Sequence, residues 1–140
     1  MAHDRALAND VEEDFDGFLD RWYAQPLFAP LARTAGFAAL RARRRTGDPA
    51  ALARALRTFS TGVQPCLTEQ IAATKVPTLL LAGAADAKYA AMYHALQRPG
   101  ASAPPLEVEL IADAGHAVPF EQPAALSRTL SAFVSRHEEA

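Results

Sequence analysis

Val-Pro-Thr-Leu-Leu-Leu-Ala-Gly-Ala-Ala-Asp, residues 76–86, decides the fold together with Asp-Ala-Gly-His-Ala-Val-Pro-Phe-Glu-Gln-Pro, residues 113–123. The first stretch contains a short, continuous apolar run over 78–82, bounded by a proline and a glycine. Such a run predicts a strand that is buried on both faces, as in a parallel sheet. The alternation of apolar and charged residues over 106–111 predicts a second strand nearer a sheet edge.

Helices are predicted around these two strands. Residues 87–97 read as a helix, residues 99–105 as a loop, and Pro123 opens a final helix with an apolar face. The resulting order of strand, helix, strand, helix implies a right-handed parallel crossover. Two parallel strands do not make a stable sheet alone, because parallel sheets need several strands and both faces covered.

The residues before Val76 show the patterns of helices only. The sequence therefore indicates an α/β chain, in which a helical cap or lid segment (residues 1–75) is followed by a β-α-β-α part with two parallel strands (residues 76–140). Within the helical segment, we expect a frayed 1–10, a helix over 11–23, one or two helices within 27–45, and a helix from the Asp48 cap and Pro49 to about residue 59.

Composition limits the possible functions. The 140 residues are 50% hydrophobic and 21% charged, with a formal net charge of −2, which is ordinary for a globular domain and gives no bulk attraction to nucleic acid or to an anionic membrane. No apolar run approaches the ~18 residues that cross a bilayer. The sequence shows no metal-ligand spacing, and no cofactor is implied. Because Cys66 is the single cysteine, no intramolecular disulfide is possible; we expect a cytoplasmic setting and a small, buried, non-nucleophilic Cys66.

Asp86 and His116 are the candidate catalytic residues. Each follows a predicted strand, and loops at the carboxyl ends of parallel strands lie together on one edge of the sheet. A carboxylate bonded to one imidazole nitrogen fixes the tautomer and leaves the other nitrogen to act as a base. The alternatives are a helix N-cap for Asp86, which is compatible with an acid role, and a loop histidine without a chemical task for His116.

The pattern of strand–Gly-x-x-Asp, then strand–x-Ala-Gly-His-x-x-x-x-Glu-x-Pro–helix, resembles the C-terminal portion of the α/β-hydrolase fold over roughly residues 76–137. These motifs are specific for the superfamily and poor at separating its activities. The resemblance implies a partial α/β-hydrolase fold, with His116 as the general base and Asp86 as the residue that orients it.

The helical segment narrows the resemblance to one family. Trp22-Tyr23-Ala24-Gln25-Pro26-Leu27-Phe28, the later Ser-Thr-Gly-Val-Gln-Pro (60–65), and Asp86-Ala87-Lys88-Tyr89 are similar to motifs of the 2-succinyl-6-hydroxy-2,4-cyclohexadiene-1-carboxylate synthases of menaquinone biosynthesis. That family eliminates pyruvate, with ring formation, from a succinylated cyclohexene precursor.

This second resemblance also implies substrate-binding residues. The family's substrate bears several carboxylates, which arginine recognises well. Arg44 is the best match to the family's cap arginine, Arg43 is the next, and Trp22 matches an aromatic residue that faces the substrate. The alternatives are a solvated, charged helix end for the arginines and core packing for Trp22.

One departure from the family is decisive for the expected activity. The sequence contains no Gly-x-Ser-x-Gly motif, so Asp86 and His116 have no serine to activate within these residues. The chain is then a truncated product, one half of a split enzyme, or a remnant with a binding role. We expect it to be inactive alone, and to pair with a missing N-terminal half or to self-associate through an exposed strand edge.

Other functions remain open at this point. The chain fits a fragment of a generic α/β-hydrolase, such as an esterase or a C–C bond hydrolase, because the acid and base motifs are shared across the superfamily. It also fits a non-catalytic interaction module that retains half of the fold.

Overall fold

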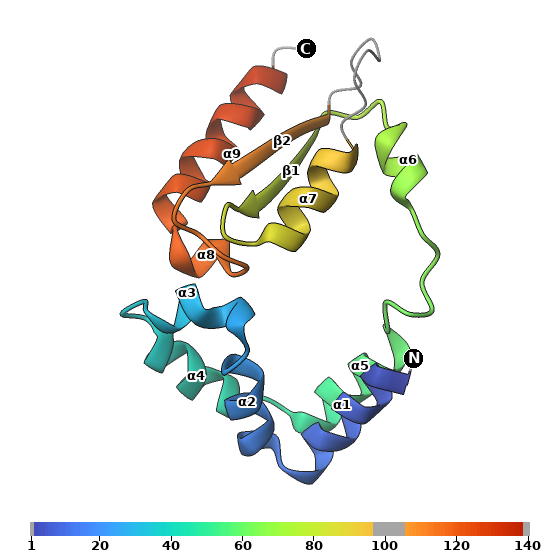
Figure 1. The fold of residues 1–140 in the computed structure, drawn as a ribbon, viewed down its shortest axis with the longest axis vertical. Coiled ribbons are helices and arrows are strands. Elements are labelled where there is room, and N and C mark those ends of the chain that lie inside the picture. Colours follow the sequence, from blue (N-terminus) through green and yellow to red (C-terminus); the bar gives the residue numbers. More distant parts are fainter. Residues whose placement is uncertain (1, 97–105, 139–140) are drawn as a thin grey trace. The chain divides into compact units, whose positions relative to one another are not determined.

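The computed structural model describes residues 2–96 and 106–138 (Figure 1). A helical part is followed by two strands with their flanking helices, which confirms the predicted partial α/β fold. The elements are α1 (Ala2–Glu13), α2 (Phe15–Tyr23), the 3-10 helix η1 (Pro26–Phe28), α3 (Ala29–Ala32), α4 (Phe37–Arg45), α5 (Pro49–Thr58), α6 (Thr68–Ala72), β1 (Thr78–Gly83), α7 (Ala87–Leu96), β2 (Leu106–Ile111), α8 (Val118–Glu121) and α9 (Pro123–His137).

The chain forms two compact units, here called the helical unit and the sheet unit, and neither is continuous in sequence. Their borders differ from the expected division at residue 75, because short segments before that residue group with the strands. The assignment of 1–75 as a cap and 76–140 as core stays a prediction. The helical unit comprises Met1–Pro26 and Ala35–Cys66, and the sheet unit comprises Leu27–Thr34 and Leu67–Ala140.

The start of the helical unit differs from the prediction. The expected frayed 1–10 is wrong, because α1 begins at Ala2, and Ala8 and Val11 are fully buried against its neighbours. The expected single helix over 11–23 is also interrupted. Asp14 ends α1 and caps α2, since its carboxylate accepts a hydrogen bond from the Gly17 N–H at 2.9 Å.

Helix α5 forms as predicted and packs along α1. The Asp48 carboxylate accepts a hydrogen bond from the Ala51 N–H at 3.1 Å, and Pro49 occupies the first turn. Arg57 on α5 donates to both carboxylate oxygens of Glu12 on α1, at 2.6 and 2.7 Å. This hydrogen bonding holds the pKa of Glu12 below its usual value. The buried core of the unit consists of Ala8, Val11, Phe18, Leu19 and Ala53.

The sheet unit contains the predicted parallel strands. β1 pairs with β2 in a register that sets Thr78 opposite Leu106 and Gly83 opposite Ile111. In Figure 1 the sheet lies between α7 and α9. Both strand predictions, and the predicted helices after each strand, are therefore confirmed, although residues 97 and 99–105 of the expected helix end and loop lie outside the described residues.

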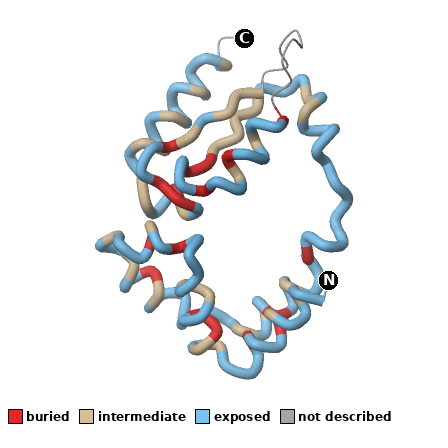
Figure 2. Tube along the Cα trace, in the orientation of Figure 1, coloured by how far each residue is buried: buried red, intermediate tan, exposed pale blue. Residues whose placement is uncertain are grey.

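Burial in the sheet unit gathers at the carboxyl ends of the strands (Figure 2). Ala82, Ile111 and Ala114 are buried, whereas Thr78 to Leu81 are only half-buried. The expectation of a first strand buried on both faces is wrong for these four residues. In the described part of the chain β1 has β2 as its sole strand neighbour, so its other edge is not covered by a strand.

Candidate active site

Asp86 lies at the carboxyl end of β1, in the turn that leads into α7. Its side chain is buried, at 5% exposure for the residue. One carboxylate oxygen, Oδ1, accepts a hydrogen bond from the Tyr89 N–H at 3.3 Å and so caps the helix. The N-cap alternative for Asp86 is therefore realised, and it occupies only one of the two oxygens.

The other oxygen of Asp86 contacts His116. Asp86 Oδ2 lies 2.7 Å from His116 Nδ1, across 30 residues of sequence. Because the imidazole side chain is 36% exposed and the carboxylate 4% exposed, the acid is the inner partner and the base faces outward. No described residue hydrogen-bonds to His116 Nε2, so this nitrogen is available to a reacting group. The geometry is that of a base oriented by a buried acid.

Aromatic rings hold the imidazole from two sides. The Phe28 ring meets it edge-on with centroids 6.0 Å apart, and the Tyr89 ring lies at 5.4 Å and a 43° tilt. Such ring contacts limit the orientations open to the imidazole. Phe28 and Tyr89 both belong to motifs in the sequence, but the motifs alone predicted no role for either residue.

A cavity of about 320 Å³ opens beside the pair. Asp86, His116, Tyr89 and Tyr93 contribute its polar groups, and apolar side chains such as Leu126 complete its wall. Burial, and then the nearby Tyr89 and Asp86, raise the pKa of Tyr93. This phenol therefore stays a neutral hydrogen-bond donor across a wide pH range. The sequence did not single out Tyr93, which lies one helical turn after Tyr89.

Close approach of two loops brings the acid and base together. The Ala85 N–H donates to the Ala114 carbonyl at 2.9 Å, which ties the turn before Asp86 to the loop before His116. A Cβ at Gly83 would collide with the carbonyl oxygens of Ala114 and Gly115. Only glycine permits this approach, whereas the sequence marked Gly83 merely as the end of a strand.

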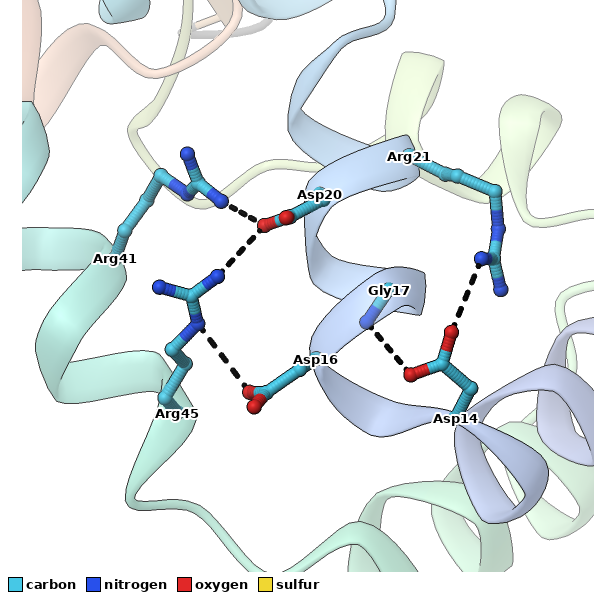
Figure 3. A network of polar contacts seen from close by, with 7 residues as sticks. All are labelled: Asp14, Asp16, Gly17, Asp20, Arg21, Arg41 and Arg45. Atoms are coloured by element: carbon cyan, nitrogen blue, oxygen red, sulfur yellow. Dashed lines mark hydrogen bonds and ion pairs between the residues drawn. The ribbon is translucent and has the colours of Figure 1, made fainter.

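The expected arginine cluster divides into two pairs. Arg41 and Arg45 lie four residues apart on α4 and face Asp16 and Asp20 of α2 (Figure 3). Arg45 contacts Asp16 Oδ1 at 3.2 Å and Asp20 Oδ1 at 3.0 Å, and Arg41 also contacts Asp20. These two guanidinium groups therefore hold α4 against α2.

Arg43 and Arg44 differ from their neighbours. Both are exposed, and among the described residues no ion pair involves either side chain. Trp22 on α2 is half-buried and stacks on Phe18, with ring centroids 5.7 Å apart. Trp22 therefore packs against the core of the helical unit, and a role toward substrate for it, Arg43 or Arg44 stays a prediction.

Cys66 is exposed, so the expectation of a buried cysteine is wrong; it lies between α5 and α6, outside the buried core of the helical unit. Within residues 2–96 and 106–138, no group of three or more His, Cys, Asp or Glu side chains is placed to hold a metal ion. No helix in the same residues has the length and apolarity to cross a membrane.

The chain is similar to known proteins over almost its whole length. The chain is 31% identical over 138 residues to the putative 2-succinyl-6-hydroxy-2,4-cyclohexadiene-1-carboxylate synthase of Bacillus subtilis, and 33% identical over 135 residues to the corresponding synthase of Serratia proteamaculans. Each alignment covers 96% of this chain and 49% of the relative. The chain thus spans about half the length of the curated relatives it matches. No family model matches the sequence.

Solved structures give the same result. The structure of MenH from S. aureus superposes with a TM-score of 0.86 at 26% identity, covering 98% of this chain and 52% of that chain. The resemblance to this synthase family within the α/β-hydrolase superfamily, drawn above from motifs, is confirmed.

Proposed function

We propose that this relative of the 2-succinyl-6-hydroxy-2,4-cyclohexadiene-1-carboxylate synthases supplies the acid, the base and the carboxylate-binding arginines of such an enzyme. The single observation that carries the proposal is the 2.7 Å contact between buried Asp86 and the outward-facing His116. A nucleophile would come from an N-terminal half, in the same polypeptide or in a separate chain. Inactivity of the 140 residues alone belongs to the proposal.

The proposed roles rest on the contact between the two side chains. His116 Nε2 accepts the proton that starts the reaction, while Asp86 keeps Nδ1 protonated and stabilises the imidazolium that forms. General base catalysis of this kind contributes roughly 10²–10⁴-fold to rate. Tyr93, whose raised pKa keeps its phenol neutral, lines the cavity and would donate a hydrogen bond to an oxygen of the bound molecule.

The substrate class is a small molecule with several carboxylates. Arg44 and Arg43 fit this class because they are exposed and not engaged in ion pairs with described residues, whereas Arg41 and Arg45 are. By its match to the family motif, Trp22 would offer an aromatic surface to the substrate. The single cysteine suits a cytoplasmic setting.

Complementation tests the proposal. We expect the chain alone to be inactive, and its mixture with an N-terminal half of a relative that contains Gly-x-Ser-x-Gly to release pyruvate from the succinylated cyclohexene carboxylate. In that mixture, His116→Ala should lower kcat by about 10²–10⁴-fold, because the base is lost. Asp86→Asn should lower kcat similarly while keeping the α7 cap, since asparagine also caps helices.

His3→Ala is the matched control, because His3 is an exposed histidine on α1, in the other unit. Hydrolysis of a simple ester by the chain alone would instead favour a generic hydrolase. The chain could also bind the N-terminal half without release of pyruvate. If His116→Ala then changed the turnover of no substrate, the result would favour a non-catalytic module.

A further inference from the structure

We infer that Glu121 is a positioning residue for His116, because its carboxylate holds the backbone on both sides of the imidazole. Glu121 is the last residue of α8. One of its oxygens, Oε1, accepts the Ala117 N–H at 3.1 Å, and the other, Oε2, accepts the Gly115 N–H. His116 is the residue between these two donors. The inference rests on the proposed role of His116 as the base.

The contact requires a carboxylate. Two backbone N–H donors face one side chain, and an ionised carboxylate offers an acceptor to each. A glutamine would offer one acceptor oxygen and turn its NH₂ group, which is a donor, toward the second N–H. Hydrogen bonds to an ionised acceptor are also shorter and stronger than bonds between neutral groups. Glu121 is thus used as a charged clamp rather than as a polar surface residue.

Close packing around Gly115 supports the same conclusion. A Cβ at this position would lie 2.8 Å from Pro30 Cγ and 3.2 Å from Glu121 Oε2. The absence of a side chain therefore lets both the α3 proline and the Glu121 carboxylate reach the loop. Pro30 and Glu121 therefore both pack against the backbone just before His116.

Fixing the loop matters for the acid–base contact. Asp86 is held by β1 and by its cap on α7, whereas His116 lies in a loop that follows β2. The 2.7 Å separation of Asp86 Oδ2 and His116 Nδ1 depends on where that loop places the imidazole. A misplacement of about 1 Å in a reacting group can cost about 10²-fold in rate. Glu121 acts on the reaction through His116, and its own oxygens are occupied by the backbone.

Nuclear magnetic resonance on the 140-residue chain tests the clamp without any catalysis. We expect Glu121→Gln to raise the amide hydrogen-exchange rates of Gly115 and Ala117 by about tenfold or more, and to broaden or remove the His116 Nδ1–H resonance. Glu109→Gln is the matched control, because Glu109 is an exposed glutamate on β2. Glu121→Ala, which removes both acceptors, should have the larger effect on exchange.

Kinetics in the complemented enzyme gives the second readout. We expect Glu121→Gln to lower kcat by roughly 10–10²-fold with KM unchanged, because the imidazole and not the substrate site is displaced. Exchange rates and the Nδ1–H resonance that match wild type, whatever the change in thermal midpoint, would overturn the inference. Altered resonances with no synthase activity in wild type would support the clamp and refute the proposed function, so the two failures are distinguishable.

Discussion

Single residues in this chain carry more than one task, and Asp86 is the clearest case. One oxygen of its carboxylate caps α7 and the other orients His116. The sequence predicted the cap and the contact with His116, because an acid and a histidine each follow a strand of the same parallel crossover; the catalytic role of the pair stays a prediction. It did not predict the aromatic rings of Phe28 and Tyr89 around His116, since ring packing depends on tertiary structure that no local pattern encodes.

Arg44 gives a testable prediction at the scale of a single residue. In the complemented enzyme we expect Arg44→Ala to raise KM by about 10-fold or more with a smaller change in kcat, because a carboxylate contact made in ground state and transition state alike is lost. Arg43→Ala should have a similar or weaker effect. Arg54→Ala, on the exposed surface of α5, is the control and should leave both constants unchanged. An unchanged KM in Arg44→Ala and Arg43→Ala would assign the carboxylate contact to other residues.

At the scale of elements, sequence patterns succeeded where local chemistry decides the structure. The apolar run that became β1, the alternating run that became β2, and the Asp48–Pro49 start of α5 formed where predicted. The prediction failed at α1, because the burial of Ala8 and Val11 against α5 stabilises a segment that looks polar by itself. The short α6 and α8 were missed because helices of four or five residues have too few turns to show a period.

The carboxyl group of Glu107, which can titrate, links β2 to α9. The Glu107 carboxylate accepts hydrogen bonds from His137 and Arg136, and these lower the pKa of Glu107, the His137 contact most. A carboxyl group whose folded pKa is depressed contributes stability above its unfolded value of 4.5, and that contribution is lost as pH falls through the folded value. The tie therefore holds at neutral pH and fails in acid.

Thermal unfolding checks this tie. We expect Glu107→Gln to lower the midpoint by roughly 1–5 °C at pH 7, in keeping with the roughly 0.2–1 kcal/mol of an exposed ion pair. The difference from wild type should vanish as the pH drops well below 4.5. Glu109→Gln serves as the control on the same strand. A difference that persists undiminished at low pH would mean that Glu107 acts by packing and not by charge.

At the scale of the whole molecule, the chain spans about half the length of the curated relatives it matches, and its described residues form a sheet of two strands. Leu79 to Leu81 are half-buried, and in the described residues no strand pairs with the outer edge of β1. Open edges of this kind pair with other chains unless they are covered. The sequence predicted the two strands and an exposed strand edge, but not which surface covers that edge.

Association in solution follows from the open edge. We expect the isolated chain to sediment as species larger than a monomer at micromolar concentration, because β1 pairs with another copy. Addition of a nucleophile-bearing N-terminal half should replace these species by a one-to-one complex. Analytical ultracentrifugation measures both states. A compact monomer that remains soluble and does not bind the N-terminal half would contradict the expectation.

The interleaving of the two units limits how this protein can be recombined. Leu27–Thr34 belongs to the sheet unit, although the residues on either side of it belong to the helical unit. A gene fusion or a protease cut near residue 75 would leave Phe28, a ring against His116, and Pro30, a neighbour of Gly115, on the wrong side of the break. An exchange of residues 1–75 as one block would therefore also remove Phe28 and Pro30 from the candidate site.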